Sequence, residues 1–393
     1  MTVRPRSSWK RYGRYNNAVT IISLPPPALV QSIDDFVKLI RDLENQARIA
    51  VDTESNSLHA YRERVCLIQF STPEQDYILD PIALDDLSPL ASIFSNPRIQ
   101  KIFHASEYDI ICLRRDYGFT FSNIFDTMQA GRILGRKQAG LDRLLEDKFG
   151  IKVNKRFQKA DWGVRPLSRD LLLYARLDTH YLIPLSDLLK TELEEKGLWQ
   201  LAQEDFIIAC SANGQKTKVE LPAWMRFNAR HDLTPRDLTV LNALLACRDL
   251  IASKLDRPPF KVLDDDSLVS IAKATPSTLE ELAKTGLTSK QMQYWGSLFL
   301  EAVGRGNDSP LVKRVAVRRP DDEFLKRLEK LKSWRKKAAS EMDVESDVVL
   351  PRSLVLALAE RGPQDMRSIM ECSPWRLERF GAQIFEVLQG SAH

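Results

Sequence analysis

The stretch from Ile49 to Ser55, IAVDTES, ends an apolar run with two carboxylates that lie one residue apart. The apolar residues predict a buried strand, and side chains two residues apart in a strand point to the same face of the sheet. We therefore expect the carboxylates of Asp52 and Glu54 to converge. Converging carboxylates repel each other, and a divalent cation between them relieves the repulsion. Oxygen ligands of this kind favour Mg²⁺ or Mn²⁺ over zinc, and the alternative is an exposed strand end that binds no metal.

Strand and helix patterns alternate around this stretch, from residue 34 to about residue 205. Apolar runs predict further strands at residues 65–72, 75–80 and 99–105. Helical periodicity predicts helices at residues 34–43, 87–96, 107–117, 125–135, 140–150 and 167–197. Consecutive early strands followed by alternating helices indicate an α/β domain with a mixed sheet covered by helices, and we assign it residues 21–212.

Composition bounds the class of protein. The 393 residues suffice for two or three domains, and no apolar run is long enough to span a bilayer. The five cysteines include no CxxC pair, which argues against a zinc site or a disulfide framework and is typical of a reducing compartment. We therefore expect a cytoplasmic protein with no membrane partner.

Basic residues are clustered, although the net charge is only +4. Residues 1–20 are expected to form a basic tail with interleaved aromatics, and it lacks the apolar stretch of a secretory signal. Two further basic clusters lie at residues 313–319 and 332–337. Each cluster alone is typical of a solvated tail, linker or helix face, and together they lean towards a nucleic-acid partner.

The chain repeats itself after a polar, linker-like segment at residues 212–224. At an offset of about 87 residues, identical residues recur in two helical segments. The pairs are Arg248 and Arg335, Ala252 and Ala339, Asp256 and Asp343, Leu263 and Leu350, Ala272 and Ala359, and Pro276 and Pro363. After a two-residue shift, residues 294–296 pair with residues 379–381. We therefore expect two helical domains, at residues 225–306 and 320–391.

Further acids stand at the edges of other predicted elements. Asp109 lies early in the helix that follows the strand at 99–105, where the helix dipole alone could satisfy it. Tyr174 and Asp178 are four residues apart, which puts a phenol and a carboxylate on one helical face. The alternative for this pair is a packed tyrosine beside an exposed acid.

The order Asp-x-Glu, Asp, Tyr-x-x-x-Asp resembles the DEDD family of 3′–5′ exonucleases, in the subgroup that carries the tyrosine. The lead-in His104-Ala105-Ser106 resembles the second motif of that family, and residues 159–178 resemble the ribonuclease D version of the third. The two helical repeats resemble tandem HRDC domains. The overall resemblance is to bacterial ribonuclease D, and it implies a ribonuclease H-like mixed sheet flanked by helices, followed by two all-α HRDC domains.

The resemblance also implies a chemistry. Asp52, Glu54, Asp109 and Asp178 would bind two divalent metal ions, Mg²⁺ or Mn²⁺, and these four acids with Tyr174 would be the catalytic residues. Asp52 would bridge the two ions, and Tyr174 would orient the attacking water. The implied activity is a monomeric 3′–5′ exoribonuclease that releases nucleoside 5′-monophosphates. Its implied RNA partners are the 3′ ends of transfer RNA precursors and other small structured RNAs.

Four other residues are weaker candidates. Trp162, Phe70 and His104 are candidates for substrate binding, each with core packing or support of the fold as the alternative. Asp126 is expected to cap a helix N-terminus, or to lie behind the metal ligands. The RNA-binding repeat and the role of the basic tail stay open.

Three other functions compete with this interpretation. The first is a nucleic-acid-binding protein on a decayed nuclease core, which the intact acids argue against. The second is a phosphatase that uses an Asp-x-Asp strand end, although the second acid here is Glu54. The third is a DNA-directed proofreading exonuclease, although no polymerase region follows.

Overall fold

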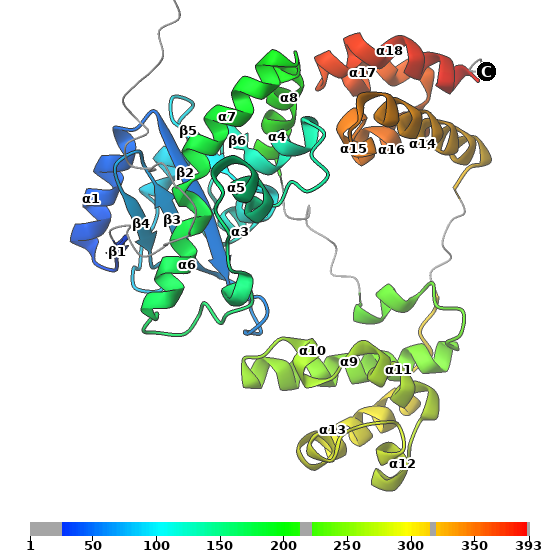
Figure 1. Ribbon diagram of the computed structural model, residues 1–393. Coiled ribbons are helices and arrows are strands. Elements are labelled where there is room, and N and C mark those ends of the chain that lie inside the picture. The colour runs from blue at the N-terminus through cyan, green and yellow to red at the C-terminus, as the bar shows by residue number, and fades with distance from the viewer. Residues whose placement is uncertain (1–25, 213–221, 315–319, 391–393) are drawn as a thin grey trace, which may run out of the picture. The chain divides into compact units, whose positions relative to one another are not determined.

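The computed structural model describes residues 26–212, 222–314 and 320–390 (Figure 1). These residues divide into two compact units. The first unit contains the α/β domain, except for residues 56–64, together with the C-terminal helices from residue 320. The second unit contains the helices between these parts and also residues 56–64. The predicted tail at residues 1–20 lies outside the described residues.

The α/β domain is built on one mixed sheet with the strand order β1-β4-β3-β2-β5-β6. Strand β3 runs antiparallel to both of its neighbours, β2 and β4. The other neighbouring pairs, β1 with β4, β2 with β5 and β5 with β6, are parallel. The strands are β1 (Ala28–Val30), β2 (Arg48–Ser55), β3 (Val65–Ser71), β4 (Asp76–Leu79), β5 (Gln100–Phe103) and β6 (Ile124–Asp126).

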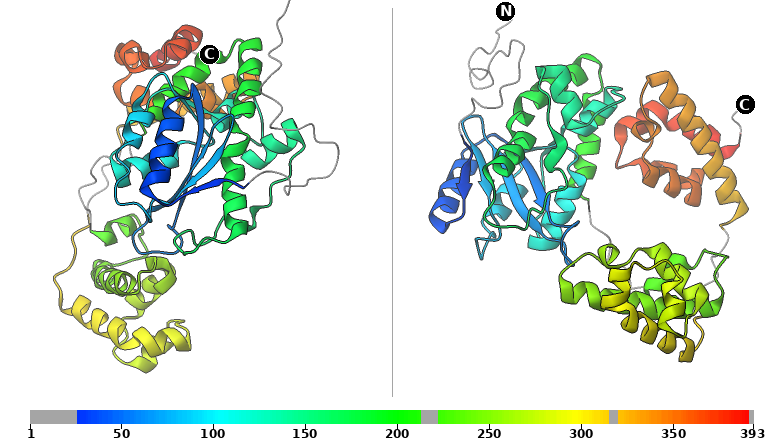
Figure 2. Two further views of the ribbon diagram at one scale, coloured as in Figure 1. Left: turned by 90° about the vertical axis from the view of Figure 1, so that its left-hand side faces the viewer. Right: turned by 60° about the horizontal axis from the view of Figure 1, so that its bottom comes forward.

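Helices cover both faces of this sheet (Figures 1 and 2). One apolar core joins the sheet to α1 (Ile33–Glu44), α2 (Leu90–Ser95) and α3 (Glu107–Tyr117). Two further clusters join the sheet to α4 (Thr127–Ile133), α5 (Leu141–Phe149), α6 (Arg169–His180), α7 (Leu182–Glu195) and α8 (Trp199–Cys210). A short 3₁₀ helix at Lys155–Phe157 precedes α6. The fold class predicted from the sequence is confirmed.

Three details of the predicted elements are wrong. The segment 167–197 forms two helices that meet at Tyr181, because Pro184 lacks an N–H group and its ring would clash with the carbonyl of residue 180 in a continuous helix. Residues 28–30 form β1, where no strand was predicted, and residues 124–126 form β6, where residue 125 was predicted to start a helix. Strands of three residues are too short to show a two-residue alternation.

The helical region consists of two copies of one arrangement. The first copy contains α9 (Pro235–Leu255), α10 (Pro259–Val262), α11 (Asp265–Ala274), α12 (Leu279–Ala283) and α13 (Ser289–Asp308), after a 3₁₀ helix at Ala223–Phe227. The second contains α14 (Asp322–Met342), α15 (Ser346–Val349), α16 (Arg352–Arg361), α17 (Met366–Met370) and α18 (Pro374–Gln389), with a 3₁₀ helix at Pro363–Asp365. Helices α14 to α17 begin and end 87 residues after α9 to α12, and α18 begins 85 residues after α13.

Equivalent side chains make equivalent contacts in the two copies. Arg248 donates to the carbonyl of Leu263 at 2.7 Å, and Arg335 donates to the carbonyl of Leu350 at 2.9 Å. Each pair is separated by 15 residues, so the offset found in the sequence is also the offset of the three-dimensional contacts. No helix among the described residues is both long and apolar enough to cross a membrane.

Candidate active site

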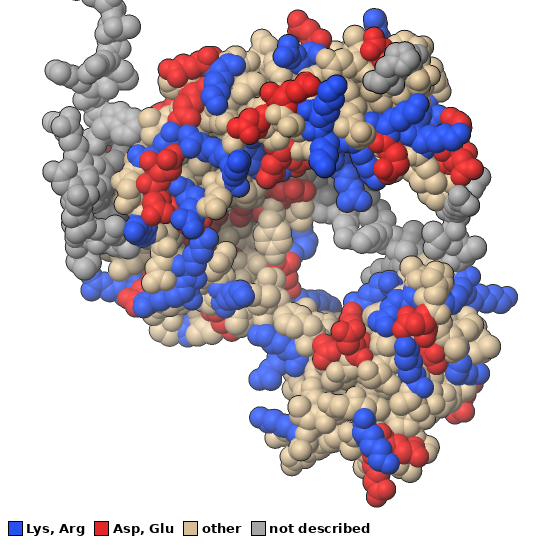
Figure 3. All heavy atoms as spheres, turned by 45° about the vertical axis from the view of Figure 1, so that its right-hand side comes forward, with Lys and Arg blue, Asp and Glu red and all other residues tan. Residues whose placement is uncertain are grey.

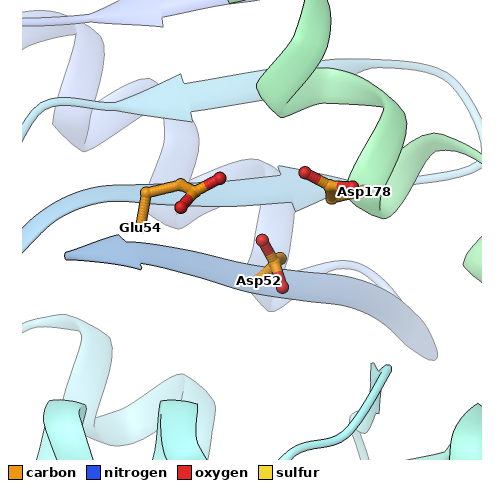
Figure 4. Close-up of side chains that lie close together, drawn as sticks. All are labelled: Asp52, Glu54 and Asp178. Atoms are coloured by element: carbon orange, nitrogen blue, oxygen red, sulfur yellow. The ribbon is translucent and has the colours of Figure 1, made fainter. Parts of the chain in front are cut away.

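Three carboxylates meet where β2 passes under α6 (Figure 4). Asp52 and Glu54 project from the same face of β2, and Asp178 projects from α6 towards them. One oxygen atom from each of the three carboxylates lies within 4.8 Å of the others. The two-residue period of the strand therefore places the two acids together, and the packing of α6 on β2 and β3 adds the third.

Asp109 reaches the same strand from α3. Its carboxylate accepts hydrogen bonds from the backbone N–H of Thr53, at 3.1 Å, and from the Thr53 hydroxyl. Asp109 is only 6% exposed, and it lies outside the group of three carboxylates that meet within 4.8 Å. The sequence analysis did not identify Thr53 as a functional residue. The one feature that could have indicated it is a hydroxyl-bearing residue between the two acids of Asp-x-Glu.

The four carboxylates have no basic partner among the described residues. Burial, followed by repulsion from Asp109, Asp178 and Glu54, raises the pKa of Asp52 well above its usual value. Burial and the neighbouring acids raise the pKa of Glu54 to about 9, and burial raises the pKa values of Asp109 and Asp178 to about 7. A group of acids in this state holds protons until a cation replaces them. The oxygen-only donor set fits hard divalent cations such as Mg²⁺ or Mn²⁺.

This charge balance predicts how pH and metal ions change stability. In the metal-free protein the folded state keeps protons that the unfolded state releases near pH 4, so the free energy of unfolding falls as pH rises from about 4 to about 9. Added Mn²⁺ binds the deprotonated acids, so we expect the rise in Tm that it causes to be larger at pH 8 than at pH 5. Thermal unfolding with EDTA or Mn²⁺ at both pH values measures this, and an equal rise at both would contradict it.

Tyr174 lies one helical turn before Asp178 on α6. Its ring stacks on Trp162, with 6.1 Å between ring centroids, and meets Phe157 edge-on at 5.8 Å. Burial, followed by the charges of Asp178, Glu54 and Asp52, raises the pKa of Tyr174 above its usual value. The phenol therefore stays protonated at neutral pH, where it is able to donate a hydrogen bond but not to accept a proton as a phenolate base.

A buried polar network fixes the other side of α6. Asp76 of β4 accepts a hydrogen bond from Ser71 at 2.7 Å and pairs with Nδ1 of His180 at 2.8 Å. The hydroxyl of Ser71 also bonds to that of Thr179, and Arg176 approaches Asp76 at 3.8 Å. These contacts set the rotation of α6 on the sheet, and this rotation directs Tyr174 and Asp178 towards β2.

Asp126 holds the turn that leads into α3. Its carboxylate caps α4 by accepting from the N–H groups of Met128 and Gln129, at 2.9 and 3.1 Å. It also accepts from the N–H groups of Ala105 and Ser106, at 3.1 and 2.7 Å. Ala105 has a positive φ of 63°, which is uncommon for a residue with a side chain. Asp126 thus caps α4, as predicted, and also fixes the turn from which α3, the helix of Asp109, begins.

Replacing Asp126 with alanine should therefore destabilise the protein and misplace Asp109. The change leaves four N–H groups without this acceptor, one of them buried and three partly buried, so we expect a loss of about 3 kcal/mol in the free energy of unfolding. As a matched control, Asp86→Ala removes an exposed carboxylate that also accepts from a backbone N–H, and it should cost less than about 1 kcal/mol. Chemical denaturation measures the free energy of unfolding of both variants. Equal losses would show that Asp126 does not fix the turn before α3.

Two of the candidates for substrate binding, Phe70 and Trp162, are buried. Phe70 is fully buried in the apolar core under α2, and Trp162 is 1% exposed beneath the ring of Tyr174. Neither ring offers a free face on which a base could stack. Nδ1 of His104 lies 2.9 Å from the hydroxyl of Thr127, and burial lowers the pKa of His104, which fits support of the motif-bearing loop.

Comparison with protein-family models identifies the two kinds of domain. Residues 27–194 match the model described as 3′-5′ exonuclease, and residues 237–303 and 324–388 match that of the HRDC domain. Exonucleases of the DEDD family use two divalent metal ions, and the acidic group at Asp52, Glu54 and Asp178 is of the kind that binds them.

Related proteins match about two thirds of the chain. Protein RRP6-like 3 of Arabidopsis thaliana is 34% identical over 65% of this chain and 31% of its own length. The exosome complex exonuclease RRP6 of Saccharomyces cerevisiae is 32% identical over 64% of this chain and 36% of its own length. The chain therefore spans about a third of the length of these curated relatives.

Solved structures show the same architecture. The catalytic core of RRP6 from Trypanosoma brucei is 27% identical, with a TM-score of 0.65 over 75% of this chain and 82% of that one. RNase D from Escherichia coli is 23% identical, with a TM-score of 0.69 over 94% of this chain and 100% of that one. The second similarity is one of fold.

Proposed function

Because the chain carries a 3′-5′ exonuclease domain followed by two HRDC domains, we propose that it is a 3′–5′ exoribonuclease that releases nucleoside 5′-monophosphates from free 3′ ends. The observation that carries this proposal is the group of three carboxylates on β2 and α6, with Asp109 on the same strand and Tyr174 one turn away. A decayed nuclease core would be expected to lose such acids first, because their mutual repulsion destabilises the fold.

The four acids would hold the metal ions. Asp52, Glu54 and Asp178, whose carboxylates meet on β2 and α6, would hold the ions together with Asp109. When bound, two divalent ions supply an activated water and stabilise charge on the leaving 3′ oxygen. Thr53 keeps the Asp109 carboxylate oriented towards β2.

Tyr174 would position the water. Its raised pKa keeps the proton on the phenol, so the hydroxyl donates a hydrogen bond and orients the nucleophile towards the scissile phosphorus. Stacking on Trp162 limits the rotation of the ring. The side chain therefore contributes alignment, which is a large part of the barrier in a phosphoryl-transfer reaction.

We propose RNA as the substrate, as the names of the exosome relatives and of RNase D suggest. We propose that the 3′ ends of transfer RNA precursors and other small structured RNAs are its substrates. We also propose that the chain acts as a cytoplasmic monomer. Light scattering of the purified protein tests the monomer, and a stable larger assembly would refute it.

A trimming assay tests the activity. The protein is incubated with a 3′-extended RNA hairpin in Mg²⁺ and then in excess EDTA, beside Asp52→Ala as the matched variant. We expect the RNA to shorten one nucleotide at a time, only with metal and only in the unsubstituted protein. Equal activity on double-stranded DNA ends would instead support a DNA-directed exonuclease, and binding without turnover would support a decayed core.

A further inference from the structure

Gln69 lies in the middle of the sheet and carries an unpaired amide group. The side chain is fully buried in β3, and neither its Nε2 nor its Oε1 atom has a hydrogen-bond partner among the residues that the structure describes. Most buried side-chain amides are hydrogen-bonded, because an unpaired one loses its contacts with water and gains nothing in return. An amide kept in such a place is therefore expected to have a use that offsets this loss.

The register of the sheet places this amide beside the acids of the candidate site. Gln69 lies directly opposite Asp52 of β2, and Leu67 lies opposite Glu54. Side chains directly opposite each other in an antiparallel pair lie on the same face of the sheet, with Cβ atoms about 5 Å apart. The amide of Gln69 therefore shares with the Asp52 carboxylate the face that α6 covers.

The other sides of the amide offer no free acceptor. Leu67 precedes it by two residues on the same face, and Ile78 lies opposite it on β4. Both side chains belong to the buried apolar cluster that packs under α6. Ser71, two residues after the amide, already bonds to Asp76 at 2.7 Å. The register therefore leaves the carboxylate of Asp52 as the acceptor within reach.

The Asp52 carboxylate also has no cation beside it. No Lys or Arg of the described residues acts on the four site acids, although Lys and Arg side chains are spread over the surface that Figure 3 shows. A cationic side chain there would compete with a divalent metal ion for the same oxygen atoms. An amide N–H group is a neutral donor, so it occupies one lone pair of a carboxylate and leaves the others for a metal ion.

A hydrogen bond of this kind is already present elsewhere in the site. The carboxylate of Asp109 accepts from the backbone N–H and the hydroxyl of Thr53. Carboxylates that bind metal ions are generally held in this way, because the bond fixes the direction of the oxygen lone pairs. Gln69 is placed to give Asp52 the same support from the neighbouring strand.

We propose that Gln69 is a positioning residue for the metal site. Its amide donates a hydrogen bond to the ionised carboxylate of Asp52 and fixes the orientation in which this carboxylate binds a divalent cation. The inference rests on the proposed function, and it adds a residue that contacts neither the metal ions nor the RNA. The amide is then unfavourable for folding and favourable for metal binding, and these two effects can be measured separately.

Gln69→Met in the full-length protein tests this proposal, because methionine has nearly the same length and volume and lacks the amide. We expect the Tm in EDTA to stay the same or to rise by about 2 °C, since an apolar group replaces an unpaired amide. In the same variant the Kd for Mn²⁺ should rise about tenfold or more, which is the usual effect of losing a hydrogen bond to a metal ligand. Gln69→Leu should change both quantities in the same directions.

Electron paramagnetic resonance of free Mn²⁺ measures this Kd in the absence of RNA. Asp52→Asn gives the Mn²⁺ binding at other places on the protein, which is subtracted. The matched control is Leu67→Met, a volume-conserving change on the same face of β3 that removes no polar atom. It should leave the Kd for Mn²⁺ unchanged.

Trimming rates distinguish positioning of a metal ligand from a role in the chemistry itself. At low Mn²⁺ concentration Gln69→Met should trim RNA about tenfold more slowly, and excess Mn²⁺ should restore the rate to within a few-fold. An unchanged Kd for Mn²⁺ would overturn the proposal. A lower Tm in EDTA for both variants would also overturn it, because the amide would then stabilise the sheet itself. Unsubstituted protein that binds Mn²⁺ but hydrolyses no RNA would instead overturn the proposed function.

Discussion

Asp52→Asn reduces the rate of RNA trimming by about 10³-fold or more. The carboxylate of Asp52 is the one whose pKa is raised by all three neighbouring acids, so it lies at the centre of the charge that a pair of cations must balance. An amide of the same shape removes one negative charge and the capacity to contact two ions. Loss of several kcal/mol of charge stabilisation corresponds to this reduction in kcat.

Single-turnover rates at saturating Mg²⁺ measure the effect of Asp52→Asn. Glu107→Gln is the matched control, because it neutralises an exposed acid at the start of α3, and it should keep the full rate. Asp52→Asn should also raise Tm in EDTA, because it removes repulsion from the metal-free site. If the variant unfolds at a lower Tm, its lost rate would be due to impaired folding. Normal trimming by the variant would contradict the assignment of Asp52.

Tyr174→Phe should lower kcat by about 10²-fold while leaving the affinities for RNA and Mn²⁺ unchanged. The substitution keeps the ring that stacks on Trp162 and removes only the hydroxyl that orients the attacking water. Because the phenol stays protonated, the rate should show no decline from loss of its proton between pH 7 and pH 9.

The hydroxyl of Tyr174 is tested by single-turnover kinetics with separate binding measurements. Tyr181→Phe, at the junction of α6 and α7, is the matched control and should retain a rate within a few-fold of the unsubstituted protein. A Tyr174→Phe protein with full kcat would show that the metal ligands alone position the water.

Much of the fold could be predicted because periodicity survives in long elements. The helix at Glu107–Tyr117 and the strand at Arg48–Ser55 match the predicted segments closely, and the offset of about 87 residues found in the sequence is also the offset between four pairs of helices. The break at Tyr181 was not predicted, because the long apolar pattern of residues 167–197 favours one helix. Pro184 interrupts that helix by its effect on the preceding turn. Strands β1 and β6 depend on pairing with distant strands, which a local pattern does not contain.

The candidate site, like the fold, could be predicted from the sequence only in part. The approach of Asp52 to Glu54 follows from the two-residue period of a strand. The approach of Asp178 depends on how α6 packs on β2 and β3, and the contact between Asp109 and Thr53 depends on how α3 packs. The position of Phe70 was not predictable, because all seven residues of β3 are buried and no alternation distinguishes its two faces.

Anomalous diffraction from crystals grown with Mn²⁺ and a 3′-terminal dinucleotide tests the central claim most directly. The account predicts two Mn²⁺ peaks about 4 Å apart, both beside Asp52, with Glu54 and Asp178 on one ion and Asp109 on the side of the other. A single ion, an absence of ions, or ions bound away from these four carboxylates would contradict it.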